Sequence, residues 1–276
     1  MTCLSIVRLV PRPAARIVGG AVRLDGEDLL AKSEAEMQRI RGRTVAMILQ
    51  DPMSSLNPVF SVGMQMREPL RMYHGLRGAA AVSRAAQLLG SVRIPSPETR
   101  LRAFPHQLSG GMRQRVVGAM AIAGPPRLLI ADEPTTSLDL TIQAQYLGLL
   151  KELQAKHRFA MIFVTHNLGI VARTCDRVAV MYAGRIVEHG PVRRLFTTPA
   201  HPYTRALLAS IPRFGARRDT LTAIAGQPPD LARLPAGCAF APRCPDVMDR
   251  CRVEAPPETA AGAGHTTRCW LHVPAA

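Results

Sequence analysis

The feature that most constrains this chain is an apolar run at residues 128–131 that ends in two adjacent carboxylates, Asp132 and Glu133. Such a run predicts a strand buried on both faces, and the acids after it then lie at the edge of a sheet. One carboxylate can hold Mg²⁺ while the other polarises a water. Upstream, Ser-Gly-Gly at 109–111 predicts a helix start whose free backbone N–H groups can face a phosphate. Residues 107–139 therefore predict part of a nucleoside triphosphate site.

Apolar runs alternate with helical patterns along the chain, which predicts an α/β fold with a parallel sheet. The runs lie at residues 45–49, 128–131, 161–164 and 178–183, and a helix is expected from about 141 to 156. In parallel sheets, ligands bind beyond the carboxyl ends of the strands. The polar residues at those ends are Gln50, Asp132, Glu133, Thr165 and His166. One polar residue after a strand would indicate only a turn, whereas three strands ending this way indicate a binding site.

Composition narrows the class of protein. The 276 residues carry a formal net charge of +15, and Lys32, Lys151 and Lys156 are the only lysines, so arginine supplies most of the positive charge. No basic run with interleaved aromatics is present, so nucleic acid is not expected as a partner. No apolar run approaches the roughly 18 residues of a membrane span. We therefore expect a cytosolic chain with reduced cysteines, whose membrane association is peripheral.

Several short motifs in this order resemble those of ATP-binding cassette (ABC) transporter ATPases, specifically the dipeptide/oligopeptide/nickel importer subfamily. Residues 108–114 are similar to the family signature, 128–133 to Walker B, 137–139 to the D-loop, Gln50 to the Q-loop residue and His166 to the switch histidine. His-Pro-Tyr-Thr-Arg-Ala-Leu-Leu at 201–208 is similar to a motif of the peptide and nickel importers. The resemblance covers essentially residues 4–269.

The resemblance implies the P-loop NTPase (RecA-like) version of the α/β fold, with an inserted helical subdomain and a Cys-rich C-terminal tail. It divides the chain into four regions. These are residues 1–50, a part of the ATPase core from the P-loop helix to the Q-loop; 51–106, the helical subdomain; 107–190, the signature helix with Walker B, D-loop and switch histidine; and 191–276, the oligopeptide-transporter-type C-terminal region. The helical subdomain is the part that docks on transmembrane partners in the family.

The resemblance also implies a role for each site residue. Glu133 would position and polarise the attacking water, His166 would contact the γ-phosphate, and Gln50 would sense metal and water. The residues implied to bind ATP or Mg²⁺ are Asp132, Ser109, Gly110, Gly111, Gln114 and Asp139. Of these, Asp132 would hold Mg²⁺, and the signature residues would clamp ATP held by the opposite subunit. Catalysis of this kind is mostly positioning and charge stabilisation.

The family's P-loop is not found in the sequence. A P-loop needs a Gly-Lys pair, because its lysine reaches the β- and γ-phosphates, whereas Lys32, Lys151 and Lys156 follow Ala31, Leu150 and Ala155. In the family, the segment similar to residues 2–9 comes directly after the P-loop Lys-Ser. The resemblance thus implies that Walker A, the N-terminal strands and the aromatic that stacks on adenine are missing. Either Met1 is an internal methionine taken as the start of an intact gene, which we favour, or the gene is truncated.

Four of the six cysteines, Cys238, Cys244, Cys251 and Cys269, fall in the C-terminal tail with five, six and seventeen residues between them. A reducing compartment disfavours disulfides. A Cys₄ metal site or four unrelated thiols remain, and we favour the metal site because a tail with few apolar residues gains order from a central ion or cluster. Family members with this tail carry a [4Fe–4S] cluster. The resemblance therefore implies iron–sulfur, with Zn²⁺ as the alternative.

The function expected from the resemblance is the ATPase subunit that powers import of peptides, or of nickel, at the cytoplasmic face of the bacterial inner membrane. Its expected partners are transmembrane permease subunits, a second ATPase subunit in a homo- or heterodimer and, indirectly, a substrate-binding protein. A non-catalytic partner or an inert truncated remnant would explain the absent P-loop. A DNA-repair ABC ATPase would suit the positive charge but would lack the motif at 201–208.

Overall fold

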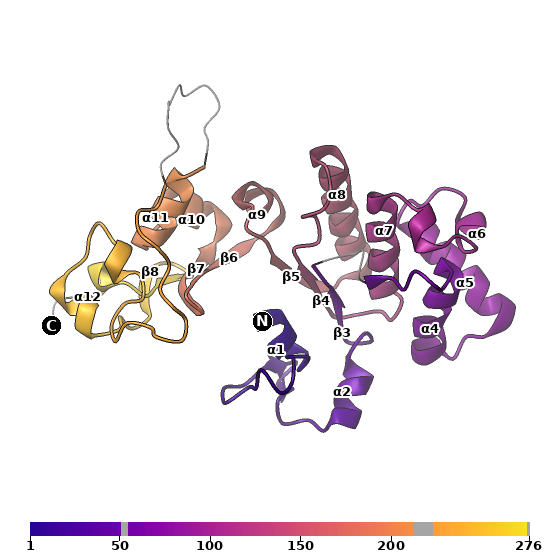
Figure 1. Cartoon of the computed structure of the whole chain (residues 1–276), viewed down its shortest axis with the longest axis horizontal. Coiled ribbons are helices and arrows are strands. Elements are labelled where there is room, and N and C mark those ends of the chain that lie inside the picture. The colour runs from indigo at the N-terminus through magenta and orange to yellow at the C-terminus, as the bar shows by residue number, and fades with distance from the viewer. Residues whose placement is uncertain (51–54, 212–222, 275–276) are drawn as a thin grey trace. The chain divides into compact units, whose positions relative to one another are not determined.

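The computed structural model describes residues 1–50, 55–211 and 223–274, which form two compact units, Met1–His166 and Asn167–Ala276 (Figure 1). The expected start of the helical subdomain at 51–54 and residues 212–222 of the expected C-terminal region lie outside the described residues. The boundary between the units falls inside the expected region 107–190. No described helix is long and apolar enough to cross a membrane.

The first unit is built on a parallel three-stranded sheet in the order β3-β4-β5, with β3 Val45–Ile48, β4 Leu128–Asp132 and β5 Ala160–Val164. The register aligns Ile48 with Ala131 and Asp132 with Val164, so the three carboxyl ends lie at one edge of the sheet. The parallel sheet predicted from the alternating pattern is therefore confirmed in these three strands.

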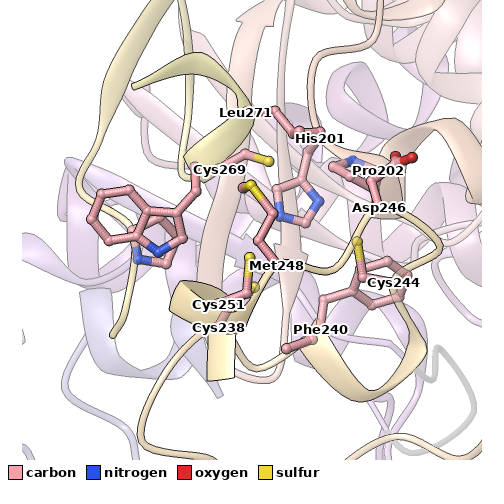
Figure 2. Close-up of a pocket in the computed structure, with 13 residues that line it drawn as sticks. His201, Pro202, Cys238, Phe240, Cys244, Asp246, Met248, Cys251, Cys269 and Leu271 are labelled. Atoms are coloured by element: carbon pink, nitrogen blue, oxygen red, sulfur yellow. The ribbon is translucent and has the colours of Figure 1, made fainter. Parts of the chain in front are cut away.

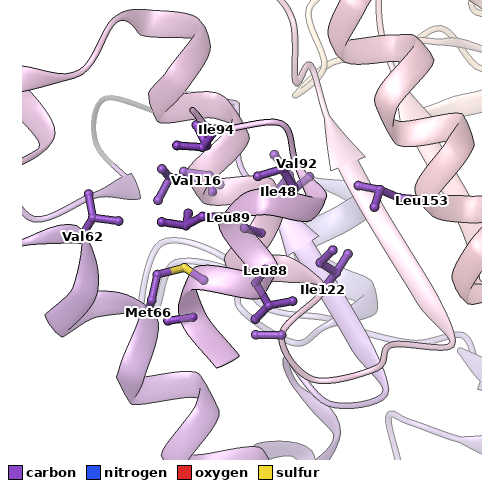
Figure 3. Close-up of a cluster of buried hydrophobic side chains, with 14 of the residues drawn as sticks. Ile48, Val62, Met66, Leu88, Leu89, Val92, Ile94, Val116, Ile122 and Leu153 are labelled. Carbon is purple, nitrogen blue, oxygen red and sulfur yellow. The ribbon is translucent and has the colours of Figure 1, made fainter. Parts of the chain in front are cut away.

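Helices of the first unit supply most of its core. They are α4 (Val62–His74), α5 (Gly78–Ser91), α6 (Pro97–Arg100), α7 (Gly110–Ala121) and α8 (Leu140–His157), with a short 3-10 turn η1 (Pro105–Gln107) before α7. Leu89 and Val92 from the α5 region pack with Val116 of α7 and Ile48 of β3 in one apolar cluster (Figure 3). This cluster also contains Leu149 of α8, so the helices and the sheet share one core.

The N-terminal segment packs against the same sheet. Its elements are α1 (Thr2–Ile6), the antiparallel strands β1 (Arg23–Leu24) and β2 (Glu27–Asp28), and α2 (Glu34–Ile40). Cys3 and Val7 contact Val45 of β3 and Ile130 of β4 in a small apolar cluster. Helix α2 begins with a capping box in which Ser33 and Glu36 satisfy each other's backbone N–H groups. These contacts hold α1 beside the central strand of the sheet.

The second unit contains an antiparallel sheet in the order β6-β7-β9-β8. Its strands are β6 (Arg177–Tyr182), β7 (Arg185–Pro191), β8 (Thr259–Gly262) and β9 (His265–Thr267). Its helices are α9 (Leu168–Thr174), α10 (Val192–Thr197), α11 (Pro202–Ala209) and α12 (Asp249–Val253), and its 3-10 turns are η2 (Ala241–Arg243) and η3 (Trp270–His272).

The run at 178–183 was expected to continue the parallel sheet, and among the described residues it does not. Strand β6 pairs only with β7, in an antiparallel ladder. The antiparallel ladder follows from the two-residue turn between β6 and β7, in which Ala183 and Gly184 both have positive φ, at 47° and 78°. A turn of this kind matches the twist of two antiparallel strands, whereas a parallel neighbour requires a crossover connection.

The shared core of the first unit predicts that substitutions along α8 change the free energy of unfolding by very different amounts, according to whether the residue is buried. Leu149 is 2% exposed and Leu140, on the same helix, is 81% exposed. We expect Leu149→Ala to lower the free energy of unfolding by about 2–5 kcal/mol, because it removes buried methyl groups and leaves a cavity. Leu140→Ala should change it by less than about 0.5 kcal/mol. Urea denaturation of the two variants measures the difference, and equal effects would contradict the packing described.

Candidate functional site

Glu133 is the centre of a polar cluster at the carboxyl edge of the parallel sheet. Its Oε2 accepts hydrogen bonds from Gln50 Nε2 at 3.1 Å and from Thr136 Oγ1 at 3.0 Å. Its Oε1 lies 3.3 Å from His166 Nδ1. Gln50 follows β3, Glu133 follows β4 and His166 follows β5, so three strand ends contribute to one cluster. The structure thus brings together the three residues predicted to be catalytic.

The backbone of Glu133 has an unusual conformation. Its φ is +45°, in the left-handed region that a residue with a Cβ rarely adopts. The Glu133 N–H donates to Val164 O at 2.9 Å, which ties the residue to β5. Strained backbone of this kind persists where the surrounding structure fixes it, and it is found often at functional sites.

Hydrogen bonding keeps Glu133 ionised. The contact with His166 is the largest cause that lowers the pKa of Glu133 below its ordinary 4.5, and the bonds from Thr136 and Gln50 lower it further against the opposing effect of burial. The carboxylate is therefore an acceptor at neutral pH, and His166 Nδ1–H donates to it. These bonds are lost only when the pH falls below the ordinary range of a glutamate. A carboxylate oriented in this way can hold a water and accept its proton.

Asp132 ends β4 beside Glu133 and is partly buried. Burial raises the pKa of the Cys3 thiol, and the nearby Asp132 charge raises it further. This coupling places the start of α1 near the carboxyl end of β4. Carboxylate oxygens are ligands that Mg²⁺ prefers, and Mg²⁺ commonly takes one or two of them with waters and phosphates. Asp132 fits that requirement, although no three acidic, His or Cys side chains among the described residues are grouped to hold a metal ion.

The signature residues form a helix start. Ser109 is the N-cap of α7, and its Oγ accepts from Met112 N at 3.3 Å, so Gly110 and Gly111 open the helix. Such a start leaves backbone N–H groups that can bind an anion. A Cβ on Gly111 would lie 2.7 Å from Ile142 Cγ2 of α8, so glycine allows the two helices to approach closely.

Asp139 and Gln114 have mainly local roles in the described structure. Asp139 is the exposed N-cap of α8, and its Oδ1 accepts from Thr141 N and Ile142 N, both at 3.0 Å. Gln114 is fully buried inside α7, where it lies beside Tyr146 of α8. The role of Gln114 as a nucleotide-contacting residue stays a prediction, and its side chain is buried in this chain.

The four cysteines of the tail line one small cavity of about 10 Å³ (Figure 2). Cys238, Cys244, Cys251 and Cys269 are all free thiols. Burial raises the pKa of Cys238 and Cys244, and it raises that of Cys269 to about 11. The structure thus collects all four predicted ligands around a common space, but no three of them stand in the positions of a ready-made single-ion site among the residues described.

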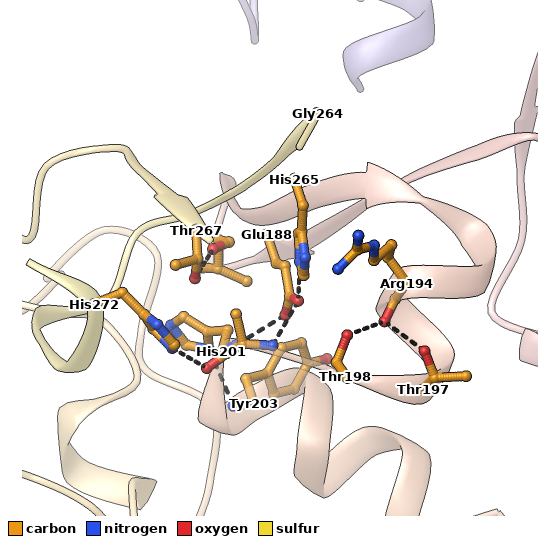
Figure 4. Close-up of polar contacts among 12 residues, drawn as sticks. Glu188, Arg194, Thr197, Thr198, His201, Tyr203, Gly264, His265, Thr267 and His272 are labelled. Carbon is orange, nitrogen blue, oxygen red and sulfur yellow. Dashed lines mark hydrogen bonds and ion pairs between the residues drawn. The ribbon is translucent and has the colours of Figure 1, made fainter. Parts of the chain in front are cut away.

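A buried polar cluster surrounds Glu188 of β7 (Figure 4). Its carboxyl group accepts from Ala200 N at 2.8 Å and His201 N at 2.9 Å, and it lies 2.7 Å from His265 Nε2. His201 Nδ1 then accepts from Tyr203 N at 3.0 Å, as the N-cap of α11. Glu188 thereby joins β7, the start of α11 and β9.

Sequence patterns did not find Glu188, His265 or Thr136. Glu188 and His265 are 77 positions apart, and neither belongs to a motif that carries chemistry. The one available signal was a charged residue inside a strand pattern, which usually indicates a solvent-facing position. Thr136 lies three residues after Glu133 and between two recognised motifs, so its spacing alone carried little information.

Two known protein families match parts of this chain. The family described as ABC transporter matches residues 4–136, and the family described as oligopeptide/dipeptide transporter, C-terminal region, matches residues 187–251. The oligopeptide transport ATP-binding protein OppD of Bacillus subtilis is 50% identical over 272 residues, covering 98% of this chain and 76% of that protein. The chain belongs to the ABC transporter ATP-binding family.

Another relative and a solved structure also resemble this chain. The dipeptide transport ATP-binding protein DppD of Bacillus subtilis is 47% identical over 271 residues, covering 98% of this chain and 81% of that protein. Among solved structures, a dimer of the ATP-binding cassette MJ0796 in a post-hydrolysis state bound to ADP and Pi matches with a TM-score of 0.57 and 25% identity. That match covers 64% of this ABC chain and 75% of the other. The α/β ABC cassette fold expected from the resemblance is confirmed.

The cluster around Glu133 predicts a measurable change in its acidity. We expect His166→Ala to raise the pKa of Glu133 toward 4.5, because His166 is the largest cause of its depression. Thr136→Val, which removes a smaller contribution, serves as the matched control and should raise it less. Carboxyl-carbon NMR titration of Glu133 measures both values. A larger effect of Thr136→Val would contradict the arrangement described.

Proposed function

We propose that this chain is the ATP-hydrolysing subunit that powers import of peptides through an ABC transporter. The observation that carries the proposal is the convergence of Gln50, Glu133 and His166 at one sheet edge, at 3.1 and 3.3 Å from the carboxylate. The relatives from Bacillus subtilis are an oligopeptide and a dipeptide transport ATP-binding protein, which supports peptide rather than nickel as cargo.

Each residue of the cluster has its own role in ATP hydrolysis. Glu133 orients the attacking water and accepts its proton, and the hydrogen bonds from Gln50 and Thr136 fix the carboxylate for this task. Asp132 would hold Mg²⁺, which supplies charge neutralisation on the phosphates when it is bound. His166, with its side chain 73% exposed, can contact the γ-phosphate while Nδ1 stays on Glu133.

The phosphate cradle is the part that the 276 residues do not supply, since no Gly-Lys pair occurs in them. We therefore propose that Ser109, Gly110 and Gly111 act on ATP held by the P-loop of a second ATPase subunit, with Asp139 nearby on α8. In the family, the signature of each ATPase subunit completes the nucleotide site of the opposite subunit. Ser109, the exposed N-cap of α7, is available for such a contact. That Walker A and the strand entering the P-loop are missing from these residues is part of the same proposal.

The open edge of the parallel sheet is compatible with a missing neighbour. Strand β5 is last in the order β3-β4-β5, and its Ile162 and Val164 are each 37% exposed. Exposed apolar strand edges are prone to pair with other chains. The family's P-loop strand would lie beside β5, and we propose that such a strand completes the sheet in the working protein.

The remaining regions fit partners at a membrane. Residues 51–106 would dock on transmembrane permease subunits. We propose the same division of the chain into four regions that the resemblance implies. The chain would then act at the cytoplasmic face of the membrane, with a substrate-binding protein connected indirectly through the permease. The charge of +15 suits a surface near anionic lipids.

We further propose that Cys238, Cys244, Cys251 and Cys269 hold a [4Fe–4S] cluster, with Zn²⁺ as the alternative. The support is that all four free thiols line the same cavity and that the walls of the cavity are otherwise largely apolar. Thiolates bind iron–sulfur clusters and zinc alike. Burial raises the pKa of Cys238, Cys244 and Cys269 and so keeps these three thiols protonated in the absence of a metal, so uptake would release protons.

The function of the signature residues can be tested by co-expression. We expect the purified 276-residue chain to show no ATP binding by equilibrium dialysis, because it has no P-loop lysine. In complex with an ATPase subunit that carries an intact P-loop, it should support ATP hydrolysis, and Ser109→Arg should reduce that rate at least tenfold by blocking the helix start. Val82→Arg, at an exposed position on α5, is the control. An unchanged rate in Ser109→Arg would contradict the shared site, and ATP binding by the chain alone would contradict the missing cradle.

Metal content tests the cysteine site. Protein purified without oxygen should contain iron and acid-labile sulfide and absorb near 400 nm, and Cys251→Ser should remove most of both. Cys175→Ser, outside the tail, should leave them unchanged. Stoichiometric zinc in a colourless protein would replace the iron–sulfur assignment, and a protein without bound metal would reject the site.

A further inference from the structure

His201 contributes a buried polar group to the wall of the cysteine cavity. Its side chain is 1% exposed, and it lines the same cavity as the four cysteines. Figure 2 shows its imidazole lying among Cys269, Cys251 and Cys244. The ring is the one nitrogen-bearing side chain other than Trp270 in that lining, so it differs from apolar neighbours such as Phe240.

The hydrogen bonds of His201 determine which ring nitrogen carries the proton. Nδ1 accepts from Tyr203 N at 3.0 Å and caps α11, so Nδ1 has no proton. In the neutral ring the proton is then on Nε2. Within residues 1–50, 55–211 and 223–274, the structure gives no hydrogen bond from this N–H to a protein acceptor. Because the ring lines the cavity, the Nε2–H is available to a group held there.

Glu188 fixes the position of His201 through a hydrogen bond from the His201 backbone N–H. The Glu188 carboxyl group, itself fully buried, accepts from Ala200 N and His201 N, and His265 lies 2.7 Å from it. His272 Nε2 lies 3.0 Å from Ala200 O on the same segment (Figure 4). The backbone on the N-terminal side of the ring is therefore held by several contacts. A donor held this firmly is suited to act on one bound atom.

We propose that His201 Nε2–H donates a hydrogen bond to a sulfur of the group held by the four cysteines, which makes His201 a positioning residue for that group. This inference rests on the cysteine site proposed above. The only carboxylate of the lining, Asp246, is paired with Arg205 at 2.5 Å and does not compete for the imidazole. Hydrogen bonds to cluster sulfurs stabilise the more electron-rich state and raise the reduction potential.

Two substitutions separate this role from the capping of α11. Asparagine is a good N-cap, so His201→Asn keeps an oxygen for Tyr203 N but is too short to reach the cavity. Glutamine places its amide near the position of Nε2, so His201→Gln keeps a donor toward the cavity and weakens the cap. A merely structural His201 would tolerate asparagine better than glutamine, whereas a donor to sulfur predicts the opposite order in the properties of the cluster.

The test uses the full chain purified without oxygen, with the reduction midpoint measured by redox titration. We expect His201→Asn to shift the midpoint to a more negative potential than in the wild type, and His201→Gln to stay close to the wild type. Equal midpoints in all three proteins, or a shift in His201→Gln alone, would overturn the inference while leaving the cysteine site intact. Wild-type protein without iron and sulfide would overturn both.

A measurement on the unmodified protein covers the case in which His201→Asn does not fold. Protein grown with ¹⁵N-labelled histidine and reduced to a paramagnetic state should show a histidine nitrogen coupling in pulsed electron paramagnetic resonance. The same spectra should contain a proton coupling that disappears in deuterium oxide. Wild-type spectra without the histidine nitrogen coupling would contradict the proposed hydrogen bond, whatever the variants do.

Discussion

The parallel register of β3, β4 and β5 is the constraint on which the nucleotide site depends. Because Ile48 aligns with Ala131 and Asp132 with Val164, the residues that follow the strands meet at one edge. Gln50 and His166 then reach the same carboxylate from opposite sides of β4. A shift of one residue in either ladder would turn alternate side chains to the other face and separate these groups.

The second unit depends on a different interaction, the buried carboxyl group of Glu188. It satisfies two backbone N–H groups at the start of α11 and contacts His265 on β9. Removing one partner would leave buried polar groups without hydrogen bonds, which is costly. The same contacts set the place of His201 in the wall of the cysteine cavity. The polar core of this unit and its cysteine cavity are therefore parts of one arrangement.

Local sequence predicted the elements of the sheet well and their pairing less well. The run at 128–131 became β4, and the helix expected at about 141–156 became α8, because burial and periodicity act locally. The run at 178–183 became a strand as expected, but the turn after it imposed an antiparallel partner. Burial of the Gln114 side chain beside Tyr146 likewise depends on the packing of α7 on α8, which no local pattern shows.

The sequence by itself determined the chemistry available to this protein: a carboxylate pair after a buried strand, a Ser-Gly-Gly helix start, a histidine after the next strand and four cysteines in the tail. These follow from residue types and short spacings. Only the tertiary structure decided which groups meet, because contacts such as Gln50 with Glu133, 83 positions apart, depend on strand register. It also placed His201 beside the four cysteines, through hydrogen bonds to a glutamate that no motif contains.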